Sequence, residues 1–224
     1  MIRALLFDFD GLLLDTEGPS YLSWVEVYER HGHELPISTW AAAIGTIDGF
    51  DPVGHLEGLG VTLDDAAHEA RRQRDLDLCD LEQLRPGVTD LLSEAERRGL
   101  RTAIVSSSDD AWIARHLDRH DLLDRFDAIV CANGDRSRAK PRPTLYLEAL
   151  ERLGVTPEEA VAFEDSPNGV AAAVAAGIFC VAVPNDVTSA LDLSAADRLV
   201  ASMADVELDA LRGPPPREDI ARGR

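Results

Sequence analysis

The second half of this chain alternates apolar runs with amphipathic segments, and this alternation constrains the fold more than any other feature of the sequence. Short apolar runs predict strands at residues 101–105, 128–131, 160–163 and 179–183, with a weaker one near residue 199. Helical periodicity predicts helices at residues 88–98, 111–117, 143–153, 168–176 and 206–211. Strands that alternate with helices are typical of a parallel sheet with crossover helices. We therefore expect an α/β fold.

Near its start the chain has an apolar run that ends in two acids and a glycine, Asp8-Phe9-Asp10-Gly11. In a strand, Asp8 and Asp10 point to the same side, and Gly11 permits a sharp turn. Two carboxylates this close are stable only if a cation lies between them or one is protonated, and both situations are characteristic of active sites. The alternative is a strand end with solvated acids, because Asp-Gly is also an ordinary turn signal.

The pattern after this first strand is helical and contains no convincing strand until the alternation begins. Helices are predicted at residues 19–30, 38–44, 52–59 and 63–78. We expect residues 16–84 to form a small helical module inserted after the first strand, with a return linker at residues 84–87. The rest of the chain would form one core, residues 1–15 and 85–212, and a proline-rich tail, residues 213–224.

The net charge of −19, from 41 acidic and 22 basic side chains, disfavours nucleic acid and anionic membranes as partners, because both would be repelled. A small ligand is then the expected partner. Cys79, Cys131 and Cys180 are odd in number and match no metal-ligand spacing, so we expect reduced, buried thiols and a cytoplasmic location. No leader pattern precedes the first strand, and no apolar run approaches the ~20 residues that a membrane helix needs.

Polar side chains follow three of the predicted strands. They are Asp8 and Asp10 after the first strand, Ser106 after residues 101–105, and Glu164 and Asp165 after residues 160–163. In an open parallel sheet, ligands bind beyond the carboxyl ends of the strands, where helices also direct free backbone N–H groups. Four acids and a hydroxyl at this edge would suit a divalent cation and a phosphate together. Taken singly each residue could be a helix cap, and capping is the preferred interpretation for Ser107, Ser108 and Ser166.

Four short motifs occur in order along the chain. They are residues 8–16, Ser106 after an apolar strand, Lys140-Pro141-Arg142-Pro143, and residues 163–169. Together they resemble the motifs of the haloacid dehalogenase-like phosphohydrolases, in the branch that includes beta-phosphoglucomutase and small sugar-phosphate phosphatases. The resemblance covers residues 2–211, with one departure at Thr144, where the family often has an acid. It implies a Rossmann-like parallel sheet core with an inserted α-helical cap.

The resemblance implies a role for each motif residue. Asp8 would be the nucleophile that forms an aspartyl-phosphate, and Asp10 would be the general acid and base. Ser106 and Ser107 would bind the phosphoryl group. Lys140, the only lysine among the 22 basic residues, would neutralise Asp8 and the transferred phosphoryl group. A compact ammonium fits where a broad guanidinium fork would not, which would explain why this residue is not arginine.

The resemblance also implies a magnesium site. Mg²⁺ would bind the side chains of Asp8 and Asp165 and the backbone carbonyl of Asp10, with Glu164 in the outer shell. The expected function is therefore a magnesium-dependent phosphatase that hydrolyses small phosphomonoesters, such as sugar or polyol phosphates, through an aspartyl-phosphate. The expected partner is a small phosphorylated metabolite, and we expect the protein to be a monomer.

Three alternatives stay open at this point. A phosphosugar mutase shares every core motif. A dehalogenase uses the same nucleophile but has no need of the acid at Asp10 or of a metal. A catalytically silent binding or regulatory module should have lost some motif residues, and none is lost here.

The helical insertion bears on the mutase alternative, because a mutase must hold a second phosphate with cationic side chains. In beta-phosphoglucomutase a lysine and an arginine flank the cap loop, and a histidine lies near the acid-base aspartate. The aligned residues here are Ile44, Asp48 and Ser20, with Gly45-Thr46 in the loop. A basic run follows at Arg71, Arg72 and Arg74. We interpret this run as a solvated helix face, although it could supply the missing charge. Hydrolysis is the expected reaction, and the sequence identifies no particular substrate.

Overall fold

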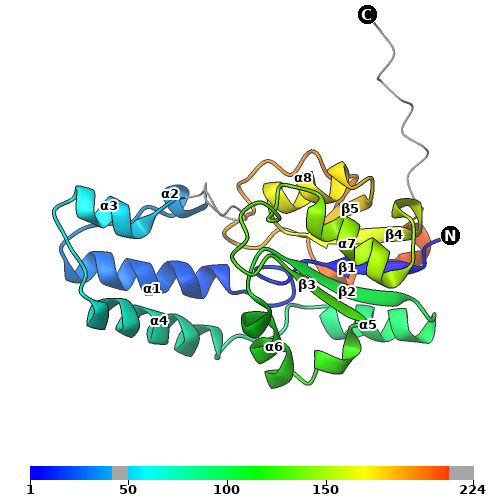
Figure 1. Ribbon diagram of the computed structural model, residues 1–224, viewed down its shortest axis with the longest axis horizontal. Helices are drawn as coiled ribbons and strands as arrows, with labels where there is room; N and C mark the ends of the chain where they lie inside the picture. The colour runs from blue at the N-terminus through cyan, green and yellow to red at the C-terminus, as the bar shows by residue number, and fades with distance from the viewer. Residues whose placement is uncertain (42–49, 212–224) are drawn as a thin grey trace, which may run out of the picture.

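The computed structural model describes residues 1–41 and 50–211, in which six parallel strands form one sheet with the order β3-β2-β1-β4-β5-β6 (Figure 1). The strands are β1 (Ala4–Phe7), β2 (Arg101–Ser106), β3 (Ala128–Cys131), β4 (Ala160–Glu164), β5 (Phe179–Ala182) and β6 (Arg198–Leu199). Every pair of neighbouring strands is parallel. The predicted α/β fold with a Rossmann-like parallel sheet is confirmed.

Strand β1 lies in the middle of the sheet, between β2 and β4. All four of its residues are fully buried, which is expected where helices cover both faces of a parallel sheet. The chain adds β2 and β3 on one side of β1 and β4 to β6 on the other. The order therefore reverses between β1 and β4, and a ligand site is expected beyond the carboxyl ends of these strands.

Two pairs of helices cover the two faces of the sheet. They are α5 (Val88–Arg97) and α6 (Asp110–Arg119) on one face, and α7 (Thr144–Leu153) and α8 (Pro167–Ala175) on the other. Each pair packs on its own hydrophobic cluster, with Leu5 and Phe7 facing α5 and α6, and Ala4 and Leu6 facing α7 and α8. Among the described residues no helix is both long and apolar enough to cross a membrane.

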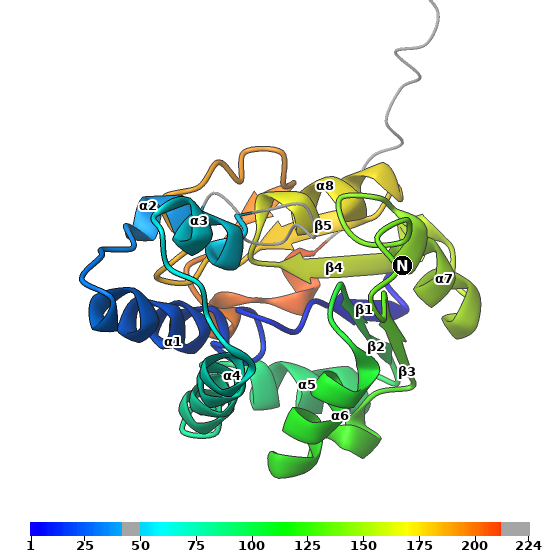
Figure 2. The same ribbon diagram turned by 60° about the vertical axis from the view of Figure 1, so that its left-hand side comes forward.

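The helices predicted between β1 and α5 are present and lie together beyond one end of the sheet (Figure 2). They are α1 (Glu17–Arg30), α2 (Ile37–Ala41), α3 (Pro52–Gly58) and α4 (Asp65–Cys79). They have a small hydrophobic cluster of their own, with Trp24, Tyr28 and Leu56 among its buried members. The division of the chain into core, helical insertion and tail stays a prediction, and the tail lies outside the described residues.

One predicted helix is wrong. Residues 206–211 contain no α-helix, because extended backbone at Val206 separates a 3₁₀ turn before this range, Met203–Asp205, from one within it, Leu208–Ala210. Met203, Leu208 and Leu211 pack on the cluster beneath α5, and these irregularly spaced contacts take the place of a continuous helical stripe. Two further 3₁₀ turns lie in connections, at Leu123–Arg125 and Pro157–Glu159.

Candidate active site

Three buried carboxylates meet where β1 and β4 end. Asp8 follows β1, whereas Glu164 ends β4 and Asp165 follows it. Each offers one oxygen, and these three oxygens lie within 4.8 Å of one another. Clustered carboxylate oxygens are the ligands that hard divalent cations such as Mg²⁺ and Ca²⁺ prefer. The residues present therefore fit a divalent metal ion.

The electrostatics of this cluster favour a bound cation. Burial is the main cause that raises the pKa of Glu164 to about 7, and the charge of Asp8 adds to it. Burial and the charges of Asp8 and Glu164 likewise raise the pKa of Asp165 well above its usual value. Carboxylates in this situation become stable as anions when a cation is bound between them.

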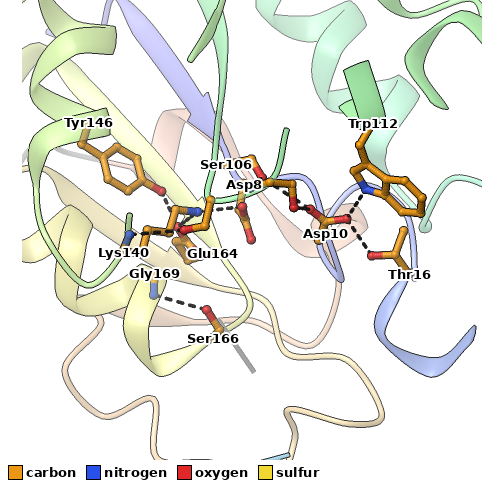
Figure 3. Close-up of polar contacts among 12 residues, drawn as sticks. Asp8, Asp10, Thr16, Ser106, Trp112, Lys140, Tyr146, Glu164, Ser166 and Gly169 are labelled. Atoms are coloured by element: carbon orange, nitrogen blue, oxygen red, sulfur yellow. Dashed lines mark hydrogen bonds and ion pairs between the residues drawn. The ribbon is translucent and has the colours of Figure 1, made fainter. Parts of the chain in front are cut away.

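Lys140 supplies positive charge to the cluster from the loop between β3 and α7. Its Nζ lies 2.6 Å from Oδ1 of Asp8 and 2.6 Å from Oε1 of Glu164 (Figure 3). Burial by itself would lower the pKa of Lys140, but the two carboxylates outweigh burial and raise the pKa above that of a free lysine. The side chain is therefore an ammonium held against Asp8.

Glu164 is held in place by three neighbours. The hydroxyl of Tyr146 on α7 donates to its Oε1 over 2.5 Å, and Lys140 contacts the same oxygen. A Cβ at position 169 would collide with the carboxylate, so only glycine fits at the start of α8. Within the described part of the chain, Oε2 of Glu164 has no hydrogen-bond partner although it is buried. An unpaired buried oxygen beside two other carboxylates is suited to contact a cation.

Asp10 extends to the other side of the site, toward α6 (Figure 3). Its Oδ1 accepts hydrogen bonds from Thr16 over 2.9 Å and from the indole Nε1 of Trp112 over 2.8 Å. Its Oδ2 accepts from Ser108 over 2.6 Å and from Ser106 over 3.4 Å. Gly11, with φ of +74°, turns the chain directly after Asp10. These donors orient the Asp10 carboxylate from three separate segments of the chain.

The three serines predicted as helix caps have different roles. Ser166 does cap α8, because its Oγ accepts from the N–H of Gly169 over 3.2 Å. Capping by Ser108 is wrong, because its hydroxyl donates to Asp10 and Asp109 occupies the cap position of α6. Capping by Ser107 is also wrong, because its Oγ accepts from the backbone N–H of Lys140 over 3.2 Å. Between β2 and α6, Ser107 and Ser108 thus contact residues of the site.

A cavity of about 540 Å³ lies between the strand ends and the helical insertion. Its floor contains the predicted site residues Asp8, Asp10, Ser106, Ser107, Lys140 and Asp165. Its opposite wall contains residues of the insertion and of α6 to which the sequence analysis gave no role, among them Glu17, Asp75 and Trp112, as well as Ser20. Lys140 is the one basic residue among the described residues that line it.

The wall on the side of the insertion is acidic. Burial, followed by the charges of Asp10, Asp8 and Asp15, raises the pKa of Glu17 to about 8. Burial also raises the pKa of Asp75, whose carboxylate pairs with Arg71 over 3.1 Å.

The basic run on α4 is paired with acids. Arg72 pairs with Glu69, and Arg74 pairs with Glu26 over 2.7 Å. Both side chains are well exposed, so the solvated face is confirmed for them. It is wrong for Arg71, whose side chain is only 15% exposed and contacts Asp75 and the ring of Trp24. Ile44, Thr46 and Asp48 lie outside the described residues.

Sequence reasoning missed further residues at the site. Asn185 follows β5 and donates its Nδ2 to Oδ2 of Asp165 over 2.8 Å and to the carbonyl of Gly11 over 3.1 Å. Its place at the carboxyl end of a predicted strand was a usable signal. Trp112 and Tyr146 lie inside predicted helices, where an aromatic residue most often packs in a core, so their polar contacts carried no signal in the sequence.

Comparison with known proteins agrees with this geometry. The family model described as "haloacid dehalogenase-like hydrolase" matches residues 2–177. YhcW of Bacillus subtilis, a protein named as a phosphatase, is 45% identical over 94% of this chain and 96% of its own length. The "phosphorylated carbohydrates phosphatase" of Thermotoga maritima is 31% identical over 79% of this chain and 82% of its own length. The crystal structure of CbbY from Rhodobacter sphaeroides with phosphate has a TM-score of 0.73 at 31% identity, over 92% of this chain and 96% of that one.

Proposed function

This chain belongs to the haloacid dehalogenase-like hydrolase family, and from that premise we propose that it is a phosphatase that hydrolyses small phosphomonoesters, in particular sugar or polyol phosphates. The observation that carries the proposal is the placement of Asp8 at the cavity floor, where it is paired with Lys140. Asp10, two positions later in the chain, lines the same cavity. A nucleophile, a cation and an acid in one cavity are what phosphoryl transfer through a covalent enzyme intermediate requires.

In the proposed reaction, a carboxylate oxygen of Asp8 attacks the phosphorus of the ester. A bond forms between Asp8 and phosphorus, the ester P–O bond breaks, and the departing oxygen takes a proton from Asp10. Water then attacks the phosphorus of the aspartyl-phosphate, the bond between Asp8 and phosphorus breaks, and Asp10 accepts a proton from that water. Inorganic phosphate leaves, and both aspartates return to their starting states.

The neighbouring residues would bind the phosphoryl group. Ser106 and Ser107 offer hydroxyls beside Asp8. The Lys140 ammonium would offset the repulsion between a phosphate dianion and the Asp8 carboxylate. Asp8, Asp165 and the Asp10 carbonyl would hold Mg²⁺, with Glu164 in the outer shell. When bound, Mg²⁺ would neutralise charge on the phosphoryl oxygens. The buried acidic cluster supports this site.

The cavity disfavours the mutase alternative. A second phosphate would face Glu17 and Asp75, and the Arg71 guanidinium beside Asp75 is already paired with it. The sequence of residues 42–49 contains no lysine or arginine. Asp10 accepts hydrogen bonds from four side chains, which hold its carboxyl group in the cavity. A dehalogenase needs no acid at this position, so this arrangement disfavours the dehalogenase alternative.

Location, assembly and domain roles complete the proposal. We propose a cytoplasmic monomer, and the three buried cysteines, which form no disulfide, support a reducing compartment. We also propose that residues 16–84 act as a cap over a catalytic core formed by residues 1–15 and 85–212, because the insertion supplies one wall of the cavity.

The test is a screen of phosphorylated metabolites with the purified protein and Mg²⁺, in which released inorganic phosphate is measured. Asp8→Asn is the matched control for contaminating phosphatases. Release from sugar or polyol monophosphates by the wild type alone supports the proposal. A folded wild-type protein that releases phosphate from no compound of the panel would refute it.

A further inference from the structure

Trp112 makes a polar contact that the proposed reaction has not used. Its indole Nε1 donates to Oδ1 of Asp10 over 2.8 Å (Figure 3). The half-buried ring comes from α6 and lines the same cavity as Asp8 and Lys140. Trp112 therefore touches the proposed general acid directly.

The indole differs chemically from the other donors to Asp10. Thr16, Ser106 and Ser108 contribute hydroxyls, each of which can rotate and accept a hydrogen bond as well as donate one. An indole N–H can only donate. The oxygen that faces it cannot carry a proton in that direction, because two hydrogens would then point at each other. Because Oδ1 of Asp10 already accepts from the indole, whereas Oδ2 faces only hydroxyls, Oδ2 is the oxygen better placed to carry the acid proton.

Oδ2 is the oxygen on the side of the proposed phosphate site. It lies 3.4 Å from Oγ of Ser106, which ends β2, and 2.6 Å from Oγ of Ser108. Strands β2 and β1 are neighbours in the sheet, so Ser106 and Asp8 border the same part of the cavity. A proton on Oδ2 is thus placed toward the ester, whereas a proton on Oδ1 would be placed toward α6.

The ring of Trp112 is itself fixed by packing. It makes an edge contact with the ring of His116, with 4.3 Å between centroids and 72° between planes. His116 is fully buried, and its ring centroid lies 6.1 Å from that of Phe9. Phe9 is the residue between Asp8 and Asp10 in the chain. The indole is therefore held against the same loop that carries both aspartates.

We propose that Trp112 is a positioning residue for Asp10, which reserves Oδ1 as an acceptor so that Oδ2 delivers the proton to the leaving oxygen. This inference rests on the proposed function, in which Asp10 is the general acid. As the ester P–O bond breaks, the proton moves from Oδ2 to the departing oxygen, and the indole N–H stabilises the carboxylate that remains. The same carboxylate then takes a proton from the attacking water.

Two substrates of nearly equal size test this role. The 4-nitrophenolate ion leaves readily without a proton, whereas phenolate leaves poorly and depends more on the general acid. We would measure kcat/KM for 4-nitrophenyl phosphate and phenyl phosphate with wild type, Trp112→Phe, Asp10→Asn and the double variant. This parameter covers only the steps through departure of the leaving group, so slow hydrolysis of the aspartyl-phosphate does not obscure it.

Trp112→Phe is expected to lower kcat/KM for phenyl phosphate about 10-fold more than for 4-nitrophenyl phosphate. Asp10→Asn should show the same selectivity to a greater extent, and Trp112→Phe should add no selectivity in the Asp10→Asn background, because both changes act through one group. Trp24→Phe, the same change in the cluster of the helical insertion, should leave the ratio of the two substrates unchanged.

Each contrary result has a distinct meaning. An equal loss for both substrates in Trp112→Phe, or a selective loss that persists in the Asp10→Asn background, would overturn the inference while the proposed function stands. Absence of selectivity in Asp10→Asn itself would overturn the proposed role of Asp10. If Trp112→Phe lowers the melting temperature severely, benzothienylalanine at position 112 keeps the ring shape, removes only the N–H, and must give the same selective loss.

Discussion

Lys140 and Asp8 form an ion pair that is almost wholly withdrawn from solvent, with 2.6 Å between Nζ and Oδ1. Lys140 also lies 2.6 Å from Glu164, so a single ammonium bridges the carboxylates at the ends of β1 and β4. Because both carboxylates converge on one nitrogen, the bridge depends on the size of the cation as well as on its charge.

Lys140→Arg keeps the charge and changes its shape. A planar guanidinium does not fit between two carboxylates that converge on one nitrogen, so we expect turnover to fall about 100-fold or more, with a lower melting temperature. Phosphate release and thermal unfolding would be measured together. Arg142→Lys, the reverse change on the exposed part of the same loop, is the control and should behave as the wild type. Near wild-type turnover in Lys140→Arg would show that charge alone suffices.

Asp8→Asn removes the proposed nucleophile with little change in volume. We expect turnover to fall by about 10³-fold or more, because Glu164, the other carboxylate paired with Lys140, is not among the residues that line the cavity. The melting temperature should fall little, since Lys140 keeps its contact with Glu164. Substantial residual phosphatase activity in a homogeneous preparation would contradict the mechanism.

Tyr146→Phe tests whether the hydroxyl on Oε1 of Glu164 supports the metal site. Without that hydrogen bond, Glu164 is less well oriented, and we expect Mg²⁺ to bind about 10-fold more weakly by titration calorimetry. Tyr28→Phe is the matched control, because Tyr28 is equally buried but bonds to His55 within the helical insertion. Equal Mg²⁺ affinity in both variants would show that the Tyr146 hydroxyl does not contribute to Mg²⁺ binding.

The raised pKa of Glu164 gives the proposed metal site a pH dependence of defined sign. Burial, then Asp8, raises this pKa from 4.5 to about 7, so between these values the folded protein holds a proton that the unfolded chain has lost. The contribution of Glu164 to stability therefore falls as pH rises through that window. A bound cation needs the ionised carboxylate and displaces the proton.

We therefore expect the rise in melting temperature on adding Mg²⁺ to be small near about pH 5 and large near about pH 8. Thermal unfolding with and without Mg²⁺ across this range measures it. Glu164→Gln should flatten the dependence, because that side chain no longer titrates. A Mg²⁺-induced shift that is the same at every pH would argue against a metal at this cluster.

The strand ends were predictable because apolar runs stop at polar residues in the sequence. The carboxyl ends of parallel neighbours share one edge, so placing Asp8 and Glu164 at such ends already predicts that they meet, and the structure confirms it. Lys140 stood out as a lone lysine, and the structure brings it to both carboxylates.

The remaining contacts depend on tertiary packing that no local pattern encodes. Trp112 reaches Asp10 across 102 positions of the chain, and within its own helix it resembles an ordinary core residue. Ser108 has the residue type and place of a helix cap, yet Asp10 competes for its hydroxyl. Residues 206–211 have an apolar spacing that fits a helix, but packing beneath α5 selects 3₁₀ turns.

The acidic wall of the cavity leads to a prediction about the charge of the leaving group. Glu17 and Asp75 line the wall on the side of the insertion, and Arg71 is neutralised by Asp75. Above about pH 8, where Glu17 is ionised, an anionic group on the far end of a substrate would approach this carboxylate in a partly desolvated cavity, where charge interactions are stronger than in water. A cationic or neutral hydroxylated group meets no such repulsion.

In assays above about pH 8 we accordingly expect kcat/KM to decrease in the order glucosamine 6-phosphate, glucose 6-phosphate, 6-phosphogluconate, with about 10-fold between the first and the last. Asp75→Asn should narrow this range, because it removes one acid and frees the Arg71 guanidinium. Arg72→Gln changes a charge on the exposed face of the same helix and should leave the order unchanged. For the same reason the protein should release phosphate from these esters without interconverting glucose 1-phosphate and glucose 6-phosphate, even when primed with the bisphosphate. A preference for 6-phosphogluconate, or efficient interconversion without phosphate release, would show that the acidic wall does not select the substrate.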